Sequence, residues 1–153
     1  MHEDFDETRN FWNKSAEDWR IQVGDDGDTN RIANSDPVLW SFLGDVRGLA
    51  VLDAGCGTGY LSMKLQKKGA HVTGVDFSER MVVIALETQP GIDFRVDSCS
   101  ELRSVNDEEF DVIVSNYVLM DTPDLQGTMH AFNRVLRPGG IVVLVFSHPC
   151  FPQ

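Results

Sequence analysis

The chain has 153 residues, 42% of them hydrophobic, which suits one domain around a single core. It carries 24 acidic and 13 basic side chains, so its formal net charge is -11, and a surface of this sign repels nucleic acid. The sequence has three cysteines and shows neither a signal-peptide pattern nor a long apolar run. These features predict a reduced, cytoplasmic protein with no nucleic-acid or membrane partner.

Residues 1–44 are predicted to form an N-terminal helical segment. Trp12, Ala16 and Trp19 follow one another at i, i+4 and i+7, the spacing of one face of a short amphipathic helix. Such a face either packs permanently on the rest of the domain or closes as a lid that excludes water from a ligand. The sequence leaves both interpretations open.

An acidic, glycine-rich loop follows at residues 24–28. Its oxygens resemble those of a calcium loop, but the spacing lacks the distal bidentate glutamate that such a loop needs, so we expect a solvated connection. Asn30 and Arg31 come next and are available to close on a surface beneath them. Asp36, which precedes a proline, is predicted as the N-cap of a second helix that ends at Gly44.

Residues 45–153 alternate short apolar runs with helical patterns. This alternation predicts an α/β fold with a doubly wound, Rossmann-like parallel sheet and helices on both faces. The last helical pattern runs from Leu125 to Leu136, and the Arg-Pro-Gly-Gly run that follows is predicted to end it. Five strands are predicted, over residues 49–54, 70–76, 92–96, 110–115 and 141–146.

A glycine-rich turn at residues 54–60 joins the first predicted strand to the next helix. Glycines let the backbone turn sharply and approach a ligand closely, and the start of a helix offers unpaired N–H groups. A strand, a glycine turn and a helix in this order are typical of a nucleotide pocket.

Polar residues stand at the ends of the predicted strands, where open parallel sheets bind their ligands. Asp76 can accept both hydroxyls of a ribose, and Asp97 can accept from an exocyclic amine. Carboxylates and amide carbonyls suit a cationic ligand better than a diphosphate. The set consists of Asp53 and Gly55, Asp76, Asp97 and Ser98, Asn116 and Tyr117, and Ser147 and His148.

Five motifs resemble, in the same order, those of the class I S-adenosylmethionine-dependent methyltransferases of the small-molecule subgroup. They are LDAGCGTGYLS, the acidic end of GVDFSERM, Asp97 with Ser98, FDVIVSNYVLMDTPD, and RPGG. The glycine turn alone is a weak signal, whereas the ordered set is specific. The resemblance covers residues 49–147 and implies methyl transfer from S-adenosylmethionine to a small molecule.

The resemblance also implies a role for each matching position around the nucleoside. Asp76 is expected to hold the ribose hydroxyls, with Phe77 and Met81 on either side of the adenine. Asp97 and Ser98 are expected to meet the adenine edge. Met81 as a plain core residue is the alternative interpretation.

The glycine turn is expected to pass under the methionine part of the cofactor. The backbone carbonyl of Asn116 would accept from the ammonium group, Tyr117 would face the transferred methyl, and Trp19 would cover the cofactor. Asp53 as a buried helix-capping carboxylate is an alternative. The turn residues assigned to the cofactor are Asp53, Gly55, Cys56, Gly57, Gly59 and Tyr60.

A general base is needed only if the acceptor is a hydroxyl or a protonated amine. His148 is the first candidate, because it follows the fifth strand and its imidazole exchanges protons near neutral pH. Asp121 is the second candidate. The alternatives are that His148 caps a strand end and that Asp121 caps a helix. No metal is expected, because His148 and Cys150 offer too few ligands.

Typical members of this family continue past the fifth strand with a helix and two further strands. We therefore expect either a fragment of a longer protein or a homo-oligomer that covers the apolar edge at residues 141–146. A cofactor-binding module without catalysis is the alternative function. An NAD(P)-dependent oxidoreductase is the lesser alternative, because the third glycine comes one residue too early for GxGxxG and a diphosphate would find no basic partner nearby.

Overall fold

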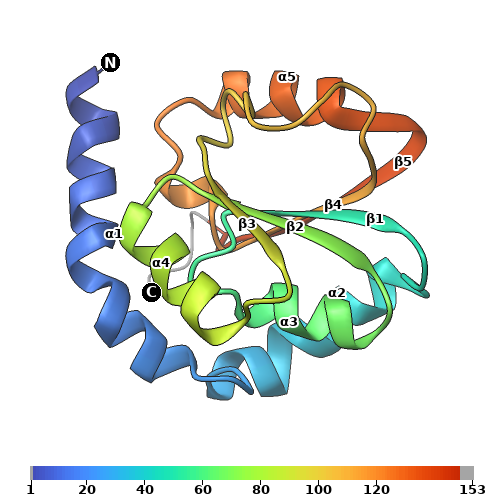
Figure 1. Cartoon of the computed structure of the whole chain (residues 1–153), viewed down its shortest axis with the longest axis horizontal. Helices are drawn as coiled ribbons and strands as arrows, with labels where there is room; N and C mark the ends of the chain where they lie inside the picture. The colour runs from blue at the N-terminus through green and yellow to red at the C-terminus, as the bar shows by residue number, and fades with distance from the viewer. Residues whose placement is uncertain (1, 149–153) are drawn as a thin grey trace.

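The computed structural model describes residues 2–148, with side chains from residue 4 onward. At its centre is a five-stranded parallel sheet with the order β3-β2-β1-β4-β5 (Figure 1). The strands are β1 (Ala50–Ala54), β2 (His71–Asp76), β3 (Asp93–Val96), β4 (Phe110–Asn116) and β5 (Leu136–Val145). The helices are α1 (His2–Val23), α2 (Asp36–Leu43), α3 (Tyr60–Lys67), α4 (Glu79–Thr88) and α5 (Leu125–Val135), with a π-helix η1 (Arg31–Ser35) and a 3-10 helix η2 (Leu119–Asp121).

The predicted doubly wound topology is confirmed. From β1 the chain winds outward to β2 and β3, and it then returns to the other side of β1 for β4 and β5. The order reverses between β1 and β4, which pair directly through Val51 with Val112 and through Asp53 with Val114. In sheets of this type, ligands bind in the crevice beyond the carboxyl ends of the two strands at this reversal.

Successive residues of β1 belong to two separate cores, because side chains alternate between the faces of a sheet. Val51 packs with α2 and α3, whereas Leu52 packs with α5, and both side chains are fully buried. Figure 1 shows α5 over one face of the sheet and α2 with α3 over the other. Burial on both faces explains why the strand is a continuous apolar run in the sequence.

The boundary between the last helix and the fifth strand differs from the prediction. Helix α5 ends at Val135 and β5 begins at Leu136, so residues 137–140 lie inside the strand, where the register against β4 shifts. A Cβ atom at Gly140 would lie 2.8 Å from the backbone oxygen of Asp111, so the close approach of the two strands requires glycine. The predicted strand start at residue 141 is therefore wrong, because the Pro-Gly-Gly run forms a strand irregularity.

The N-terminal segment is helical, as predicted, but α1 spans 22 residues instead of forming a short helix. It packs beside α4 at one side of the sheet (Figure 1). Although α1 is long, no helix within residues 2–148 combines the length and the apolar character needed to cross a membrane.

Asp36 does not cap α2, which corrects the prediction. Ser35 occupies the N-cap position, and the carboxylate of Asp36 is buried. It accepts hydrogen bonds from the Tyr60 hydroxyl and, at 3.2 Å, from the Lys64 ammonium. Burial and the bond to Asp36 raise the pKa of Tyr60. This network joins the N-terminal segment to α3. The Asp36 carboxylate therefore makes long-range hydrogen bonds instead of capping the helix in which it lies.

Strand β5 is a terminal strand of the sheet in the part of the chain that the structure describes, as predicted. Three apolar side chains within β5 or directly after it are exposed: Ile141 by 43%, Val142 by 37% and Phe146 by 53%. An apolar edge of this kind is a template for pairing with a further strand.

Candidate functional site

The turn after β1 forms the floor of the candidate site. Gly55 and Gly57 have φ angles of 80° and 53°, in the left-handed region that favours glycine. A Cβ atom at Gly55 would also collide with the side chain of Val118. These two glycines therefore let the backbone pass close beneath whatever occupies the site.

Asp76 ends β2 and is held by the backbone. Its Oδ2 accepts from the Gly57 N–H and its Oδ1 from the Ser78 N–H, both at 2.9 Å. Burial raises the pKa of Asp76 to about 6, although these hydrogen bonds oppose the shift. Each carboxylate oxygen can accept more than one hydrogen bond, so Asp76 can also bind hydroxyl groups of a ligand.

Asp53 lies behind the turn and supports it. The residue is 1% exposed, and its Oδ2 accepts from the Ser62 hydroxyl at 2.6 Å. Burial raises the pKa of Asp53 to about 6, against the opposing effect of this hydrogen bond. Asp53 thereby joins β1 to α3.

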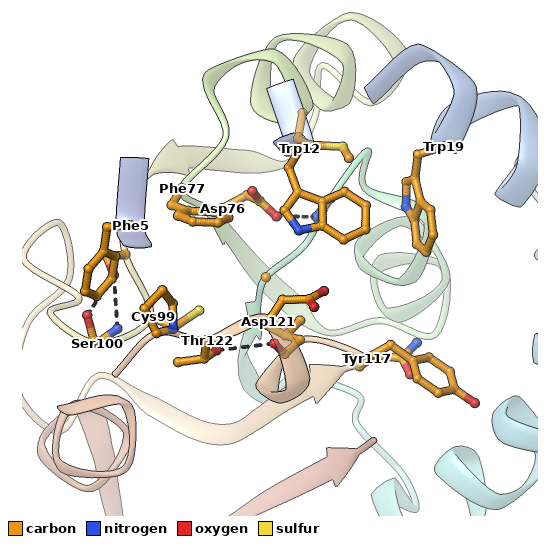
Figure 2. Close-up of a pocket in the computed structure, with 17 residues that line it drawn as sticks. Phe5, Trp12, Trp19, Asp76, Phe77, Cys99, Ser100, Tyr117, Asp121 and Thr122 are labelled. Atoms are coloured by element: carbon orange, nitrogen blue, oxygen red, sulfur yellow. Dashed lines mark hydrogen bonds between the residues drawn. The ribbon is translucent and has the colours of Figure 1, made fainter. Parts of the chain in front are cut away.

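A cavity, here named the inner cavity, lies beyond the carboxyl ends of β1, β2 and β4. It holds about 670 Å³ of empty space, including the part open to solvent. In Figure 2, Trp12 and Phe77 lie on one side of it and Asp121 and Thr122 on the other. The predicted site residues in its lining are Gly55, Gly57, Asp76, Phe77, Met81, Ser98, Asn116, Tyr117 and the candidate base Asp121.

Six predicted site residues lie outside this lining, and their assignment to the site stays a prediction. The two oxygens of Asp97 accept from the backbone N–H groups of Ser98, at 2.8 Å, and Ser104, at 2.7 Å, which fixes the loop after β3. His148 is exposed. Cys56 is buried, which raises the pKa of its thiol. The six are Asp53, Cys56, Gly59, Tyr60, Asp97 and His148.

One wall of the inner cavity comes from α1. Trp12 and Trp19 pack edge to face, with ring centroids 5.2 Å apart and an interplanar angle of 80°. Both rings also pack against the buried residues Ala16, Met81 and Ile84. The tryptophan face therefore packs on the core and lines the cavity at the same time, as does Met81.

Several lining residues are missed by the sequence prediction. Phe5 lies seven residues before Trp12, and therefore two helical turns away on the same face of α1, so extending the helical period by one step would have found it. The others lie in irregular segments, where no periodic pattern marks the inward-facing side chains. They are Cys99, Ser100, Val118, Thr122 and Pro123.

The inner cavity offers hydrogen-bond acceptors and negative charge. Asn116 lines the cavity, and its Oδ1 atom is buried and has no hydrogen-bond partner among residues 2–148. Asp76 and Asp121 add carboxylates, and none of the described lining residues is a lysine or an arginine. This set fits a ligand that carries an ammonium group, a diol and a flat ring. It does not fit a diphosphate.

A second cavity, here named the outer cavity, adjoins the inner one and holds about 1070 Å³ of empty space, including the part open to solvent. The two cavities share Trp12, Trp19, Tyr117 and Asp121. Asp121 therefore borders both cavities. Asp121 is exposed at its surface, and partial desolvation of the side chain raises the pKa of its carboxyl.

Comparison with known proteins places this geometry in a family. The family profile of a methyltransferase domain matches residues 52–144. A ubiquinone biosynthesis O-methyltransferase from Hydrogenovibrio crunogenus is 31% identical over 140 residues, which cover 87% of this chain and 57% of that protein. The crystal structure of an S-adenosylmethionine-dependent methyltransferase from Mesorhizobium loti is 31% identical with a TM-score of 0.69, covering 74% of this chain and 53% of that one.

A more distant structure has the same fold. Phosphoethanolamine N-methyltransferase 1 from Haemonchus contortus, solved with phosphoethanolamine and S-adenosylhomocysteine, has a TM-score of 0.76 at 20% identity over 92% of this chain and 32% of that one. This chain spans little more than half the length of its curated relative from Hydrogenovibrio. The matched residues run from β1 into β5 and include the glycine turn, Asp76 and Asn116. The chain belongs to the methyltransferase domain family, as its five ordered motifs predicted.

Proposed function

We propose that this chain binds S-adenosylmethionine in the inner cavity and transfers the methyl group to a small-molecule acceptor. One observation carries the proposal: the cavity joins the backbone-held carboxylate of Asp76 to the buried, unpartnered Oδ1 of Asn116, with no basic side chain among the described lining residues. The names of the relatives from Hydrogenovibrio and Mesorhizobium support the same reaction.

In this arrangement each side chain has a defined task. Asp76 accepts the ribose hydroxyls, and Asn116 accepts from the ammonium group, either through the backbone carbonyl that the resemblance implies or through its unpartnered Oδ1. Phe77 and Met81 flank the adenine. The cofactor supplies a methyl carbon already activated by its sulfonium, so the protein has to align the reactants and exclude water. Alignment of this kind is worth on the order of 7 to 11 kcal/mol.

Asp121 is the candidate general base in this proposal. It lies where the two cavities meet, and its carboxyl has a raised pKa, which makes it a better proton acceptor. The O-methyltransferase relative supports a hydroxyl acceptor, whose proton leaves during transfer and passes to Asp121. His148 is exposed and lies outside the lining of both cavities, so Asp121 takes its place as first candidate.

Turnover separates an enzyme from a binding module. The chain is incubated with S-adenosylmethionine and a panel of hydroxylated small molecules, and the formation of S-adenosylhomocysteine is measured. We expect product that depends on the presence of an acceptor. Saturable cofactor binding without product from any acceptor would favour the non-catalytic module, and the absence of cofactor binding would contradict the proposal.

We also propose that the exposed edge of β5 pairs with a second copy of the chain. The exposed side chains of Ile141, Val142 and Phe146 support this pairing. Light scattering at rising concentration should show a dimer, and a monomer at high concentration would contradict it.

The free thiols of Cys56 and Cys99 support a reducing compartment, and we propose the cytoplasm.

A further inference from the structure

The outer cavity differs in chemistry from the inner one. Its lining includes four aromatic side chains, those of Phe11, Trp12, Trp19 and Tyr117, and one cation, Arg31. The described lining of the inner cavity contains no such cation. Asp121 lines both cavities, so the outer cavity differs from the inner one in having a guanidinium as well as that carboxylate.

Arg31 is a buried cation, with 6% of its surface exposed. Its guanidinium carbon lies 5.0 Å from the ring centroid of Trp19 and 5.3 Å from that of Tyr117. Contacts with two aromatic rings hold the guanidinium in place and strengthen as water is excluded. Because the chain has a net charge of -11, a buried cation beside its site distinguishes this cavity from the rest of the molecule.

Asp28 fixes Arg31 and leaves most of its donors unused. One carboxylate oxygen accepts from Nη1 at 2.5 Å, and the other accepts from the Arg31 backbone N–H at 2.9 Å. A guanidinium has five N–H groups, and within residues 2–148 only Nη1 makes a hydrogen bond. The other donors are available to a ligand in the outer cavity.

Tyr117 is fixed beside Arg31 and reaches both cavities. Its hydroxyl accepts from Asn30 Nδ2 at 3.0 Å, and its backbone N–H donates to the Val145 carbonyl at 2.8 Å. Its φ angle of 59° is unusual for a residue with a side chain, and such conformations gather at functional sites. Asn30, Arg31 and Tyr117 together form a preorganised wall that runs from the outer cavity to the junction.

We propose that the outer cavity holds the methyl acceptor and that this acceptor is an aromatic hydroxy compound with a carboxylate, which Arg31 binds. This inference rests on the proposed function, because the acceptor must meet the methyl group at the junction. The aromatic lining suits a flat ring, and a guanidinium matches a carboxylate in bidentate geometry. The hydroxyl of the acceptor then faces Asp121, and its carboxylate faces Arg31.

Binding to the unaltered chain tests the charge preference without a mutation. Calorimetry in the presence of S-adenosylhomocysteine compares hydroxybenzoate, hydroxyphenylacetate and hydroxycinnamate, each with its own neutral amide of the same shape. We expect at least one carboxylate to bind tenfold or more tightly than its amide. Equal affinities within every pair, or no binding by any of the six compounds, would overturn the inference.

Substitution of Arg31 then assigns the preference to one side chain. In Arg31→Gln, the affinity for the carboxylate should fall to that of the amide, while the affinity for S-adenosylhomocysteine stays within about twofold. Arg103→Gln is the matched control, because that side chain is 79% exposed, and it should change neither affinity. A carboxylate preference that survives Arg31→Gln overturns the inference.

Binding of S-adenosylhomocysteine distinguishes failure of the acceptor inference from failure of the proposed function. If the unaltered chain binds S-adenosylhomocysteine but shows no carboxylate preference, the inference about the acceptor fails and the proposed function stands. If the unaltered chain does not bind S-adenosylhomocysteine, the proposed function fails. If Arg31→Gln does not fold, the comparison of carboxylates with amides on the unaltered chain decides.

Discussion

The two sides of the candidate site are built in different ways. On the sheet side, the β1 turn and the end of β2 provide the binding groups, and two backbone N–H groups hold the carboxylate of Asp76. On the N-terminal side, the walls are side chains of α1 and of residues 28–31, held by ring contacts and by the Asp28–Arg31 ion pair.

This difference suggests a division of labour. A site made by the backbone keeps its shape when neighbouring side chains change, whereas a wall of side chains can be altered without rebuilding the sheet. The sheet side therefore suits the constant partner, the cofactor, and the N-terminal side suits the partner that sets specificity. Asp121 lines both cavities, so its position relative to the ligands depends on both sides of the site.

The largest expected effect is at this junction. Asp121→Asn removes the proton acceptor and should lower kcat on a hydroxyl acceptor by roughly 10²- to 10⁴-fold, with cofactor affinity little changed. Steady-state kinetics with separate kcat and KM values measure it. Asp18→Asn, an exposed position on α1, is the control. An unchanged kcat in Asp121→Asn would remove this residue from the mechanism.

The next effect tests the sheet side. Gly55→Ala places a Cβ atom against Val118 at a left-handed φ, which should lower the free energy of unfolding by about 2–5 kcal/mol. Gly24→Ala is the matched control, because Gly24 also has a positive φ but a Cβ atom there meets no atom within 4 Å. Its cost should be only about 1–2 kcal/mol. Equal costs in urea unfolding would show that contact with Val118 does not constrain the turn.

The smallest effect is a pH dependence of cofactor binding. Because burial raises the pKa of Asp76 to about 6, the carboxyl is neutral below this pH and ionised above it. Ribose hydroxyls bond more strongly to the ionised form, so affinity should rise with pH through about 6, by at most about tenfold per unit, and then level off. Calorimetry with S-adenosylhomocysteine from about pH 5 to about pH 8 measures the profile.

Two variants assign that profile to one carboxyl. Asp76→Asn should flatten it, whereas Asp53→Asn should keep it, although the pKa of Asp53 is also raised to about 6. Asp53 bonds to Ser62 and lies outside the cavity lining, so its ionisation has no direct contact with the ligand. A flat profile in the unaltered chain would argue against Asp76 as the ribose acceptor.

The sheet could be predicted from the sequence because its determinants are local. Apolar runs, the glycine turn and the alternation of strands with helices are all visible within short windows, and the doubly wound order follows from them. The predictions that were wrong concern positions whose structure depends on a residue far away in the sequence. Leu136 joins β5 because it pairs with Phe110. Asp36 leaves its expected cap position because Tyr60 and Lys64 bind its carboxylate.

The same distinction between local patterns and long-range contacts applies to the residues of the candidate site. Gly55, Gly57, Asp76 and Asn116 could be named because motif and strand end coincide at these positions. The sequence marked Arg31 only as a residue able to close on something beneath it. Its stacking on Trp19 and Tyr117 depends on three segments meeting in space, and no local pattern encodes that meeting.

The central claim is that the inner cavity binds S-adenosylmethionine, and calorimetric titration of the chain tests it most directly. The account predicts saturable binding of S-adenosylmethionine, weakened roughly 10- to 100-fold by Asp76→Asn, since hydrogen bonds to a charged group contribute about 1.5–3 kcal/mol. It also predicts no saturable binding of NAD. Saturable binding of NAD without binding of S-adenosylmethionine would contradict it.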